Sequence, residues 1–327
     1  MVGKNNNKVS FVDIALEHTE KKWETHWLKR IDNMVNWNKF SHKLEKRYAK
    51  GEGRPSYPPI QLFKCLLLAE WYGLSDRQLE EAMEFRIDFR KFTGLSFELE
   101  APDYSTFSVF RKRMLPIWNK LLTTLNEQLE IKGFKIKKAI SVDATLVEAH
   151  SKPTGKDSEG DEDASWRGFP SKKIKDEKGN EQIARRPALY GYKINLSSSV
   201  NHGFIADVSV CKASEHETHH LTEFISKETK EVYADKGYVG NRILLQKRKI
   251  KDGIQMKASR GNPLTQKDIE RNKRITKKRR IVESIFGSLK TNYGWHKTRF
   301  VGLIRNQLGI TLTAIAWNIR KLYLITQ

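Results

Sequence analysis

Apolar residues recur at helical spacing through the first part of the chain. Trp23, Trp27 and Ile31 begin an apolar stripe in a polar segment, and a denser apolar stretch covers residues 59–71. Repeats of three to four residues are typical of amphipathic helices. The pattern therefore predicts an all-helical region over residues 1–133, with the tryptophans in its core.

The dense helix is followed by signals for a short turn and a second helix. Gly73 is suited to end the first helix, and Ser75 and Gln78 have the spacing of a capping box that begins the next one. Two helices joined by so short a turn are typical of a helix-turn-helix, in which the second helix reads the DNA major groove.

A third helix is predicted after Asp103. It begins near Ser105, carries Arg111 and Arg113, and meets Pro116, which should kink or restart it. A three-helix unit for DNA binding and dimerisation fits this pattern, and a helical scaffold without a DNA-reading role fits it nearly as well.

The hydrophobic period changes near residue 134, where alternating apolar residues indicate strands. Strands are expected at residues 136–147, 190–196, 204–210, 231–235 and 253–258. A last amphipathic helix follows around residues 281–289. This order predicts a mixed α/β sheet flanked by helices, in a second domain over residues 134–327.

A long polar segment, residues 151–186, separates the first two predicted strands. Its acidic residues, among them Asp161 and Asp163, are spaced like those of a calcium-binding loop, but the glycine and the final glutamate of such a loop are missing. We therefore expect a solvated loop without a calcium ion.

Composition narrows the class of protein. Of 327 residues, 38% are hydrophobic, which suffices for a packed core and excludes global disorder. No apolar stretch approaches the ~20 residues of a membrane helix, and no signal peptide is indicated, so we expect a cytoplasmic protein with no membrane partner. Cys65 and Cys211 lie far apart without C-x-x-C spacing, which argues against a disulfide scaffold or a cysteine zinc site.

The charge indicates a polyanionic partner. The chain has 60 Lys+Arg and 39 Asp+Glu, a net charge of +21, and residues 246–300 alone hold 17 basic and 4 acidic residues. Nucleic acid is favoured over a membrane surface because no basic amphipathic helix with exposed aromatic residues stands out. The densest basic run, residues 271–280, leads into the spacing of the last helix, so we expect a packed helix there.

One motif suggests zinc chemistry. His216, Glu217 and His220 match the H-E-x-x-H pattern of metalloproteases. Ser214 and Glu217, however, have the spacing of a capping box, which favours the start of a helix at this point over a zinc site.

Three carboxylates form a stronger constellation. Asp143 lies inside the first predicted strand, Asp235 ends a later strand just before Gly237, and Glu283 lies on the last helix. A charge within an apolar strand is costly unless it is paired or binds a metal. Together the acids offer an all-oxygen site for Mg²⁺, and two such ions would suit phosphoryl transfer. An ordinary salt bridge or strand-end aspartate is the alternative for each acid.

Helix geometry groups Glu283 with two cations. At about 100° per residue, Arg279, Glu283 and Lys290 lie on one narrow face of the helix. This arrangement suits a carboxylate that holds a metal at a phosphate gripped by cations on either side. A solvated row of ion pairs is the alternative.

Segments around these acids carry a family resemblance. They are SVDATLVEAH with Asp143, YGYKINL, ADKGY with Asp235, and RRIVESIFGSLK with Glu283, preceded by the helical block SYPPIQLFKCLLLAEWYGLSDRQLEEAM. From about residue 54 to residue 318 the chain resembles bacterial insertion-sequence transposases of the DDE superfamily, particularly the insertion-sequence-five group. The resemblance implies an RNase H-like catalytic core that follows an all-helical DNA-binding region.

The resemblance also implies roles for individual residues. Asp143, Asp235 and Glu283 would hold two Mg²⁺ or Mn²⁺ ions, and the enzyme would cut transposon ends and transfer their 3′-OH groups into target DNA. Double-stranded DNA would be the partner of a homodimer that is nucleoid-associated when bound. The implied DNA contacts are Arg279, Lys290, Lys236, Arg280, Trp295, His296, Arg111 and Arg113, with core packing favoured for Trp295.

The chain departs from the family signature at Thr276, where the family has a tyrosine, so the ring contact of that tyrosine is not expected here. Two other functions stay open at this point. The acids would also serve a metal-dependent nuclease without strand transfer, and the helical block would also serve a non-catalytic DNA-binding regulator.

Overall fold

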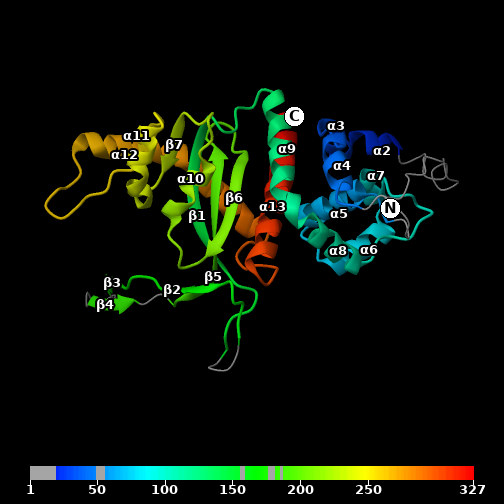
Figure 1. The fold of residues 1–327 in the computed structure, drawn as a ribbon, viewed down its shortest axis with the longest axis horizontal. Coiled ribbons are helices and arrows are strands. Elements are labelled where there is room, and N and C mark those ends of the chain that lie inside the picture. The colour runs from blue at the N-terminus through cyan, green and yellow to red at the C-terminus, as the bar shows by residue number, and fades with distance from the viewer. Residues whose placement is uncertain (1–19, 49–55, 155–158, 176–180, 185–186) are drawn as a thin grey trace. The chain divides into compact units, whose positions relative to one another are not determined.

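The computed structural model describes residues 20–48, 56–154, 159–175, 181–184 and 187–327 (Figure 1). The chain divides into two compact units, a helical unit of Met1–Ile136 with Thr311–Gln327, and a sheet unit of Lys137–Ile310. The second domain expected from the sequence ran to residue 327, whereas the segment from Thr311 onward groups with the helical unit.

The described part of the helical unit consists of helices of moderate length. None of the described helices is long and apolar enough to cross a membrane. The helices are α2 (Glu20–Thr25), α3 (Trp27–Met34), α4 (Asn38–Glu45), α5 (Pro59–Tyr72), α6 (Asp76–Phe85), α7 (Ile87–Thr93), α8 (Tyr104–Met114), α9 (Trp118–Ile131) and the last part of α13 (Leu303–Ile325).

The turn between α5 and α6 confirms the sequence prediction. Gly73 ends α5 with a left-handed φ of 67°. The Ser75 hydroxyl accepts a hydrogen bond from the Gln78 backbone N–H, and the Gln78 side chain accepts one from the Ser75 N–H, so the capping box is complete. The sequence patterns predict no helix between the second and third predicted helices, but the short helix α7, which buries Phe89 and Phe92, lies there.

The third predicted helix is α8. The Asp103 carboxylate accepts a hydrogen bond from the Thr106 N–H and caps its first turn. Pro116 lies in a short 3₁₀ turn, Leu115–Ile117, and the chain restarts as α9 directly afterwards. The predicted interruption by proline is confirmed, because proline cannot donate the hydrogen bond that a continuous helix requires.

The tryptophans of the first helices pack inward as expected. Trp23 is buried, and the Trp27 ring lies edge-on to Trp71, with ring centroids 5.3 Å apart. Leu28 and Ile31 on α3 are fully buried beside them. The apolar stripe of the sequence therefore does form a core face of the helical unit.

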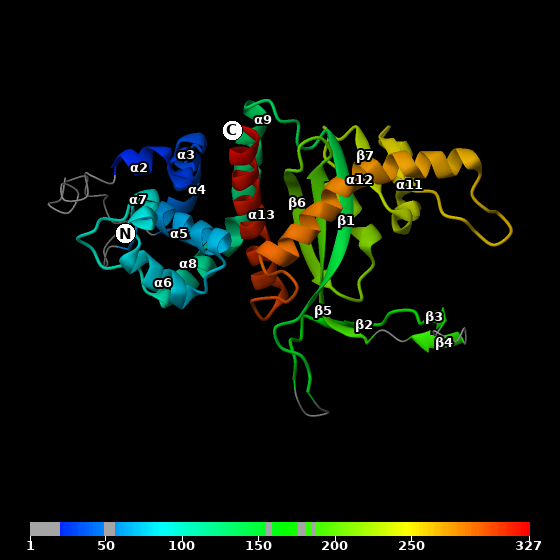
Figure 2. The same ribbon diagram turned by 180° about the vertical axis from the view of Figure 1, so that it is seen from behind.

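The sheet unit is built on a mixed sheet, which confirms the predicted fold class (Figure 2). β1 pairs antiparallel with β5 and parallel with β7; β6 extends the sheet beyond β5, and β8 extends it in parallel beyond β7. The strand order is therefore β6-β5-β1-β7-β8. The strands are β1 (Ala139–Glu148), β5 (Leu189–Ser199), β6 (Ile205–Lys212), β7 (Glu231–Ala234) and β8 (Lys251–Ile254).

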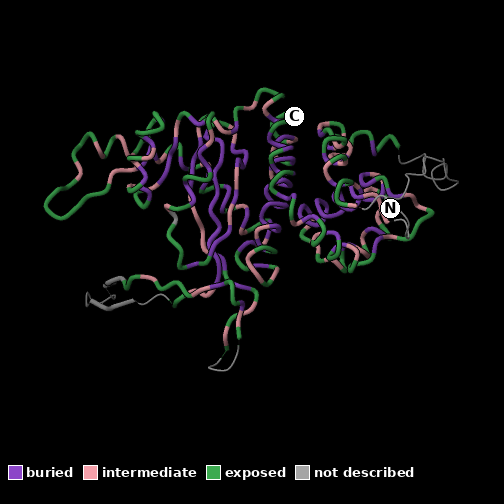
Figure 3. Tube along the Cα trace, viewed as in Figure 1, coloured by how far each residue is buried: buried purple, intermediate pink, exposed green. Residues whose placement is uncertain are grey.

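Helices lie against both faces of this sheet. One face packs Ile140 and Val142 against the short helices α10 (Leu221–Phe224) and α11 (Arg242–Lys247). On the other face Tyr233 and Ala139 pack against Ile275 of α12 (Gln266–Asn292). β5 is buried along almost its whole length, as the purple trace in Figure 3 shows.

The segment 151–186 is not the plain loop that the sequence predicted. β2 (Ser165–Arg167) pairs with the beginning of β5, and β3 (Lys172–Lys175) and β4 (Glu181–Ala184) form a separate two-stranded sheet. The sequences of these strands lack the alternation of apolar residues from which strands are predicted.

Two acids of the same segment cap a helix. Asp161 is only 1% exposed, and its carboxylate accepts a hydrogen bond from the Gly302 N–H at 3.0 Å. The Asp163 carboxylate accepts one from the Leu303 N–H at 2.8 Å, at the first residue of α13. Negative charge at a helix N-terminus is stabilising. The expectation of a solvated loop is therefore wrong for Asp161, whereas Asp157 of the same acidic series lies outside the described residues.

Candidate active site

The sheet register brings the first two acids together. β1 and β7 pair in parallel with Ile140 opposite Val232 and Ser141 opposite Tyr233. Continuing this pairing by two residues along each strand places Asp143 beside Asp235. Side chains alternate along extended chain, so Asp143 shares the face of Ala139, and Asp235, whose backbone is still extended, shares that of Tyr233. Both acids therefore lie on the face that α12 covers.

Arg279 on α12 connects the first acid to the third. Its Nη2 donates a hydrogen bond to Oδ2 of Asp143 at 2.9 Å. Its Nη1 lies 3.6 Å from Oε1 of Glu283, one helical turn further along. The Arg279 residue is only 8% exposed. Asp143 and Glu283, which are far apart in the sequence, thus share one buried guanidinium.

Asp235 is held by the turn that follows it. Its Oδ1 accepts a hydrogen bond from the Gly237 N–H at 2.7 Å, where the 3₁₀ helix η4 (Lys236–Asn241) begins. A Cβ atom added to Gly237 would lie 2.9 Å from that same oxygen. Glycine at this position therefore lets the Asp235 carboxylate lie close to the backbone.

Gln255 is a part of the site that the sequence did not single out. It follows β8, and its backbone N–H donates to the Ala234 carbonyl of β7. Its Oε1 lies 3.4 Å from Nη1 of Arg279, and its Nε2 donates to Oγ1 of Thr276 at 2.9 Å. Thr276, at the position of the family tyrosine, therefore anchors the residue that supports Arg279.

The sequence predicts that Arg279 contacts DNA phosphates. In the structure its side chain instead faces other residues of the chain. The guanidinium is directed at Asp143, Glu283 and Gln255. Its Nε is buried and has no hydrogen-bond partner among the described residues. In this conformation Arg279 positions the acids.

A basic groove runs along the first half of α12. Lys273, Lys277 and Arg280 line it, and Thr276 lies between them. The sequence shows the basic run and Arg280. It does not show which cations of the run lie on the same surface. Because Thr276 also bonds Gln255, this groove adjoins the residues that hold Arg279.

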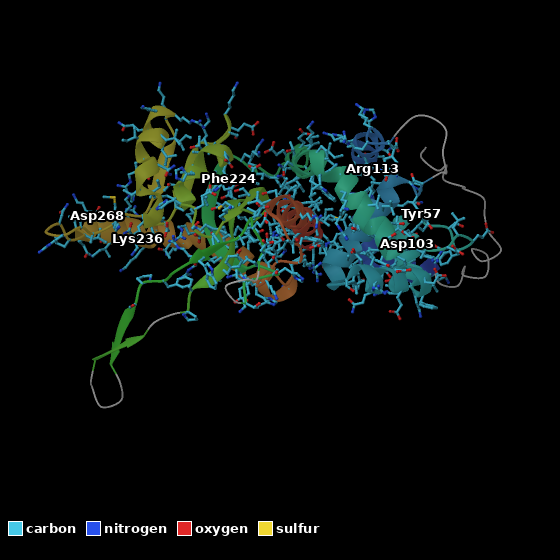
Figure 4. All side chains as sticks on the ribbon, turned by 60° about the horizontal axis from the view of Figure 1, so that its bottom comes forward. Tyr57, Asp103, Arg113, Phe224, Lys236 and Asp268 are labelled. Atoms are coloured by element: carbon cyan, nitrogen blue, oxygen red, sulfur yellow. The ribbon has the colours of Figure 1, made fainter. Side chains whose placement is uncertain are left out.

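Lys290 and Lys236 flank the acids in sequence. Lys290 is half-buried and lies two turns beyond Glu283 on α12, a rise of about 10 Å. Lys236 is exposed directly after Asp235, and Figure 4 shows it in the same region of the sheet unit as Asp268 of α12.

The two ring side chains after α12 differ in exposure. Trp295 is 5% exposed, so its ring offers no free face to a DNA base, and the packing role is supported. His296 is exposed, and its backbone carbonyl accepts a hydrogen bond from the Glu148 N–H at the end of β1.

Arg111 and Arg113 are both engaged within the helical unit. Arg111 forms an ion pair with Asp76 in the first turn of α6, and its side chain is 13% exposed. The Arg113 guanidinium lies over the Tyr48 ring, 4.4 Å from its centroid; Figure 4 labels Arg113. Arg111 thus holds α8 to α6 in this conformation instead of extending towards a partner.

The H-E-x-x-H segment does not form the zinc helix of a metalloprotease. His216 precedes the 3₁₀ helix η3 (Glu217–His219), and His220 follows it, so no α-helix carries both histidines. The expected helix start after Ser214 is wrong: the Ser214 N–H donates to Oγ of Ser165, and the helix α10 begins only at Leu221, after the 3₁₀ turn. The side chain of Glu217 lies outside what the structure describes, so its capping role stays a prediction.

The donor set of the three acids fits a hard divalent cation. Asp143, Asp235 and Glu283 offer only carboxylate oxygens, the ligands that Mg²⁺ and Mn²⁺ prefer. The Asp143 and Glu283 side chains are 20% and 49% exposed, which leaves room for water and phosphate as further ligands. The charges of Asp143 and Glu283 are compensated in part by the Arg279 guanidinium.

Comparisons with known proteins show which family the chain resembles. A family described as a transposase domain (DUF772) matches residues 17–113, and a family described as a transposase DDE domain matches residues 135–319. The chain is 33% identical over 213 residues to the transposase for insertion sequence element IS1106 of Neisseria meningitidis serogroup B, a match that covers 62% of this chain and 72% of that relative. No solved structure matches the chain.

Proposed function

The chain belongs to the transposases with a DDE domain, and from this premise we propose that it cuts the ends of an insertion sequence and joins them to target DNA. Such enzymes act on DNA and in general use divalent metal ions. The observation that carries the proposal is the position of Arg279 on α12, which donates a hydrogen bond to Asp143 and lies close to Glu283, over the sheet face that Asp143 shares with Asp235 by the strand register.

Asp143, Asp235 and Glu283 would hold two Mg²⁺ or Mn²⁺ ions. When bound, such ions activate the attacking oxygen and stabilise the leaving oxygen of an in-line displacement at phosphorus. The acids come from two neighbouring strands and a helix, so packing of the sheet unit fixes their spacing.

The surrounding residues of the chain keep the acids in place. Arg279 offsets the repulsion between Asp143 and Glu283 and sets the orientation of both carboxylates. Gln255 supports Arg279 from the neighbouring strand end, and the Gly237 N–H orients Asp235. Groups held in advance in this way need no rearrangement during the reaction.

The chemistry is two phosphoryl transfers at this site. In the first, a water oxygen attacks a phosphodiester at the end of the element, the bond from phosphorus to the 3′ oxygen breaks, and a 3′-OH is released. In the second, that 3′-OH attacks a target phosphodiester and displaces the target's 3′ oxygen. Lys236, Lys290 and the groove cations Lys273, Lys277 and Arg280 would grip the flanking phosphates.

The remaining parts of the chain would select and pair the ends. The helical region up to residue 133 would read the terminal inverted repeats, and the catalytic domain would begin near residue 134. Because two ends are joined in one event, we expect a homodimer on double-stranded DNA.

Cleavage and joining of DNA that carries the ends of the element, with Mg²⁺ or Mn²⁺, tests the proposal. The wild type should release 3′-OH ends and join them to target DNA. Asp235→Ala and Glu283→Gln should lose at least about 1000-fold in rate, which corresponds to about 4 kcal/mol. Glu270→Gln, an exposed acid on the same helix α12, serves as the control and should keep the wild-type rate.

Three outcomes would contradict the proposal. The wild type could neither nick nor join, or Asp235→Ala could join at the normal rate. Nicking without any joining, with both metals and with pre-cut ends, would identify a nuclease instead.

A further inference from the structure

Three side chains with metal-binding atoms meet at the edge of the sheet formed by β6. Cys211 lies near the end of β6, Glu215 in the turn after it, and His220 between η3 and α10. One ligand atom from each, a sulfur, a carboxylate oxygen and an imidazole nitrogen, lies within 4.8 Å of the other two. None of them belongs to the acidic site, which is on β1, β7 and α12.

His220 has the orientation of a metal ligand. Its Nδ1 is 3.4 Å from Oε2 of Glu223 and 3.3 Å from Oγ of Ser209. Histidines that bind metal through one ring nitrogen usually donate the other N–H to such a carboxylate. This arrangement leaves the Nε2 lone pair directed away from Glu223, towards Glu215.

The Nε2 atom of His220 is a buried group without a hydrogen bond. Among the described residues it has no hydrogen-bond partner, although the residue is only 8% exposed. Oε1 of Glu215 nevertheless lies 3.3 Å away. In a tetrahedral zinc site, two ligand atoms that each lie about 2.0 Å from the ion are about 3.3 Å apart and do not hydrogen-bond to each other. The distance between His220 Nε2 and Glu215 Oε1 fits this geometry.

Cys211 is supported in the same manner. It is 3% exposed, and Nδ2 of Asn195 on β5 donates a hydrogen bond to its Sγ at 3.3 Å. A donor to the sulfur favours the thiolate, which is the form that binds metals.

We propose that Cys211, Glu215 and His220 bind one thiophilic divalent cation of the zinc class, with the fourth position open to water. A sulfur, nitrogen and oxygen set selects Zn²⁺ over Mg²⁺, whereas the all-oxygen acids select the reverse. The sequence analysis argued against a cysteine zinc site because C-x-x-C spacing is absent. In the proposed site the ligands are instead brought together by β6 and the turn after it. The H-E-x-x-H segment contributes its last histidine only.

The site would fix the turn next to the catalytic strand. The Thr218 carbonyl, between Glu215 and His220, accepts a hydrogen bond from Nδ2 of Asn241 at 3.0 Å. Asn241 ends η4, the turn that follows Asp235. A metal that holds residues 211–220 together would therefore stabilise the support of η4.

The test is the metal content and the cobalt spectrum of the full-length protein. After dialysis against Zn²⁺ and then metal-free buffer, wild type should retain one zinc per chain in elemental analysis, and excess Mg²⁺ should not displace it. Replacement by Co²⁺ should give the intense sulfur-to-cobalt absorption of a thiolate ligand. Cys211→Ser should abolish that band, and Cys65→Ser, the other buried cysteine, should leave it unchanged.

Two further variants guard against loss of folding. Glu215→Gln changes an exposed side chain and should weaken Co²⁺ binding without altering the circular dichroism spectrum. Glu223→Ala, which removes the carboxylate that accepts from the His220 N–H, should weaken it about 10–100-fold. Exposed His219→Gln is the control and should bind normally. A wild type that retains no zinc, or a thiolate band that persists in Cys211→Ser, would overturn the proposal.

Discussion

At the scale of single residues, the site depends on Arg279. Its guanidinium is buried, donates to Asp143 through Nη2, and lies close to both Glu283 and Gln255 through Nη1. A planar guanidinium can contact several acceptors at fixed angles, whereas a lysine ammonium on a flexible stem cannot. The shape of Arg279, as much as its charge, therefore sets the orientation of the acids.

Arg279→Lys tests this positioning role. The charge is retained, so we expect the free energy of unfolding to change by less than about 1 kcal/mol. Strand cleavage should fall about 10–100-fold, because the acids lose their common anchor. Cleavage rates and urea denaturation measure the two effects. Arg274→Lys, at an exposed position of α12, is the matched control; equal rates for the two variants would refute the role.

Gly237→Ala tests the placement of Asp235. The added Cβ would lie 2.9 Å from Oδ1 of Asp235, so the carboxylate must rotate away. A displacement of this order costs about 100-fold in rate while the fold is kept. Gly240→Ala, whose added Cβ meets no atom within 4 Å, should cleave normally. Wild-type cleavage by Gly237→Ala would show that the close contact is not needed.

Some residues of the site can be recognised from the sequence, and others cannot. Asp143 and Asp235 are unusual because charge in a strand is costly, and Arg279 and Glu283 are linked by helical spacing. Gln255 carries no such signal: a glutamine near a strand end is ordinary until the register of β8 is known. The bond between Arg279 and Asp143 depends on packing across the sheet, which spacing along the chain does not encode.

At the scale of secondary-structure elements, the inserted segment 151–186 stabilises α13. Asp161 and Asp163 accept hydrogen bonds from the Gly302 and Leu303 N–H groups at its first turn. The N–H groups at the start of a helix have no partner within the helix, so side chains must satisfy them. The segment thus has a structural role that its polar composition did not indicate.

Asp161→Ala should lower the free energy of unfolding by about 1–2 kcal/mol, the usual cost of a lost helix cap. Equilibrium urea denaturation of the full chain measures it. Asp161→Asn keeps an acceptor oxygen and should recover part of the loss. Glu162→Ala, the exposed neighbour, should have almost no effect; a loss as large as that of Asp161→Ala would argue against the cap.

Elements with apolar alternation were predicted well, and elements without it were not. β1, β5, β6 and β7 lie close to the predicted strands because each carries core side chains. β8 covers Lys251–Ile254 and not residues 253–258, since its apolar signal is only a few residues long. β2, β3 and β4 have no alternation of apolar residues in their sequences, so a hydrophobic pattern does not predict them.

At the scale of the whole molecule, more than half of the net charge of +21 lies in residues 246–300, which hold 17 basic and 4 acidic residues. The groove of Lys273, Lys277 and Arg280 on α12 lies next to Thr276 and hence to the support of Arg279. The sequence located the basic run, but only the fold shows which cations line one surface.

DNA binding should depend on salt through this groove. Each phosphate contact contributes about 0.9 to the slope of log K against log salt concentration. The double variant Lys277→Gln with Arg280→Gln should therefore reduce the slope by about 1.8 in a fluorescence anisotropy titration. Lys227→Gln with Lys230→Gln, two exposed lysines before β7, is the charge-matched control. If both double variants reduced the slope equally, the salt dependence would depend on net charge alone and not on the groove.

The central claim is that Asp143, Asp235 and Glu283 form one cation-binding site. Iron-directed backbone cleavage measures this most directly: Fe²⁺ takes the place of Mg²⁺, and ascorbate with peroxide generates radicals that cut the chain where the iron is held. We expect cuts near all three acids, suppressed together by excess Mg²⁺ and absent in Asp235→Ala. Cuts at only one of the three segments, or cuts that Mg²⁺ does not suppress, would contradict it.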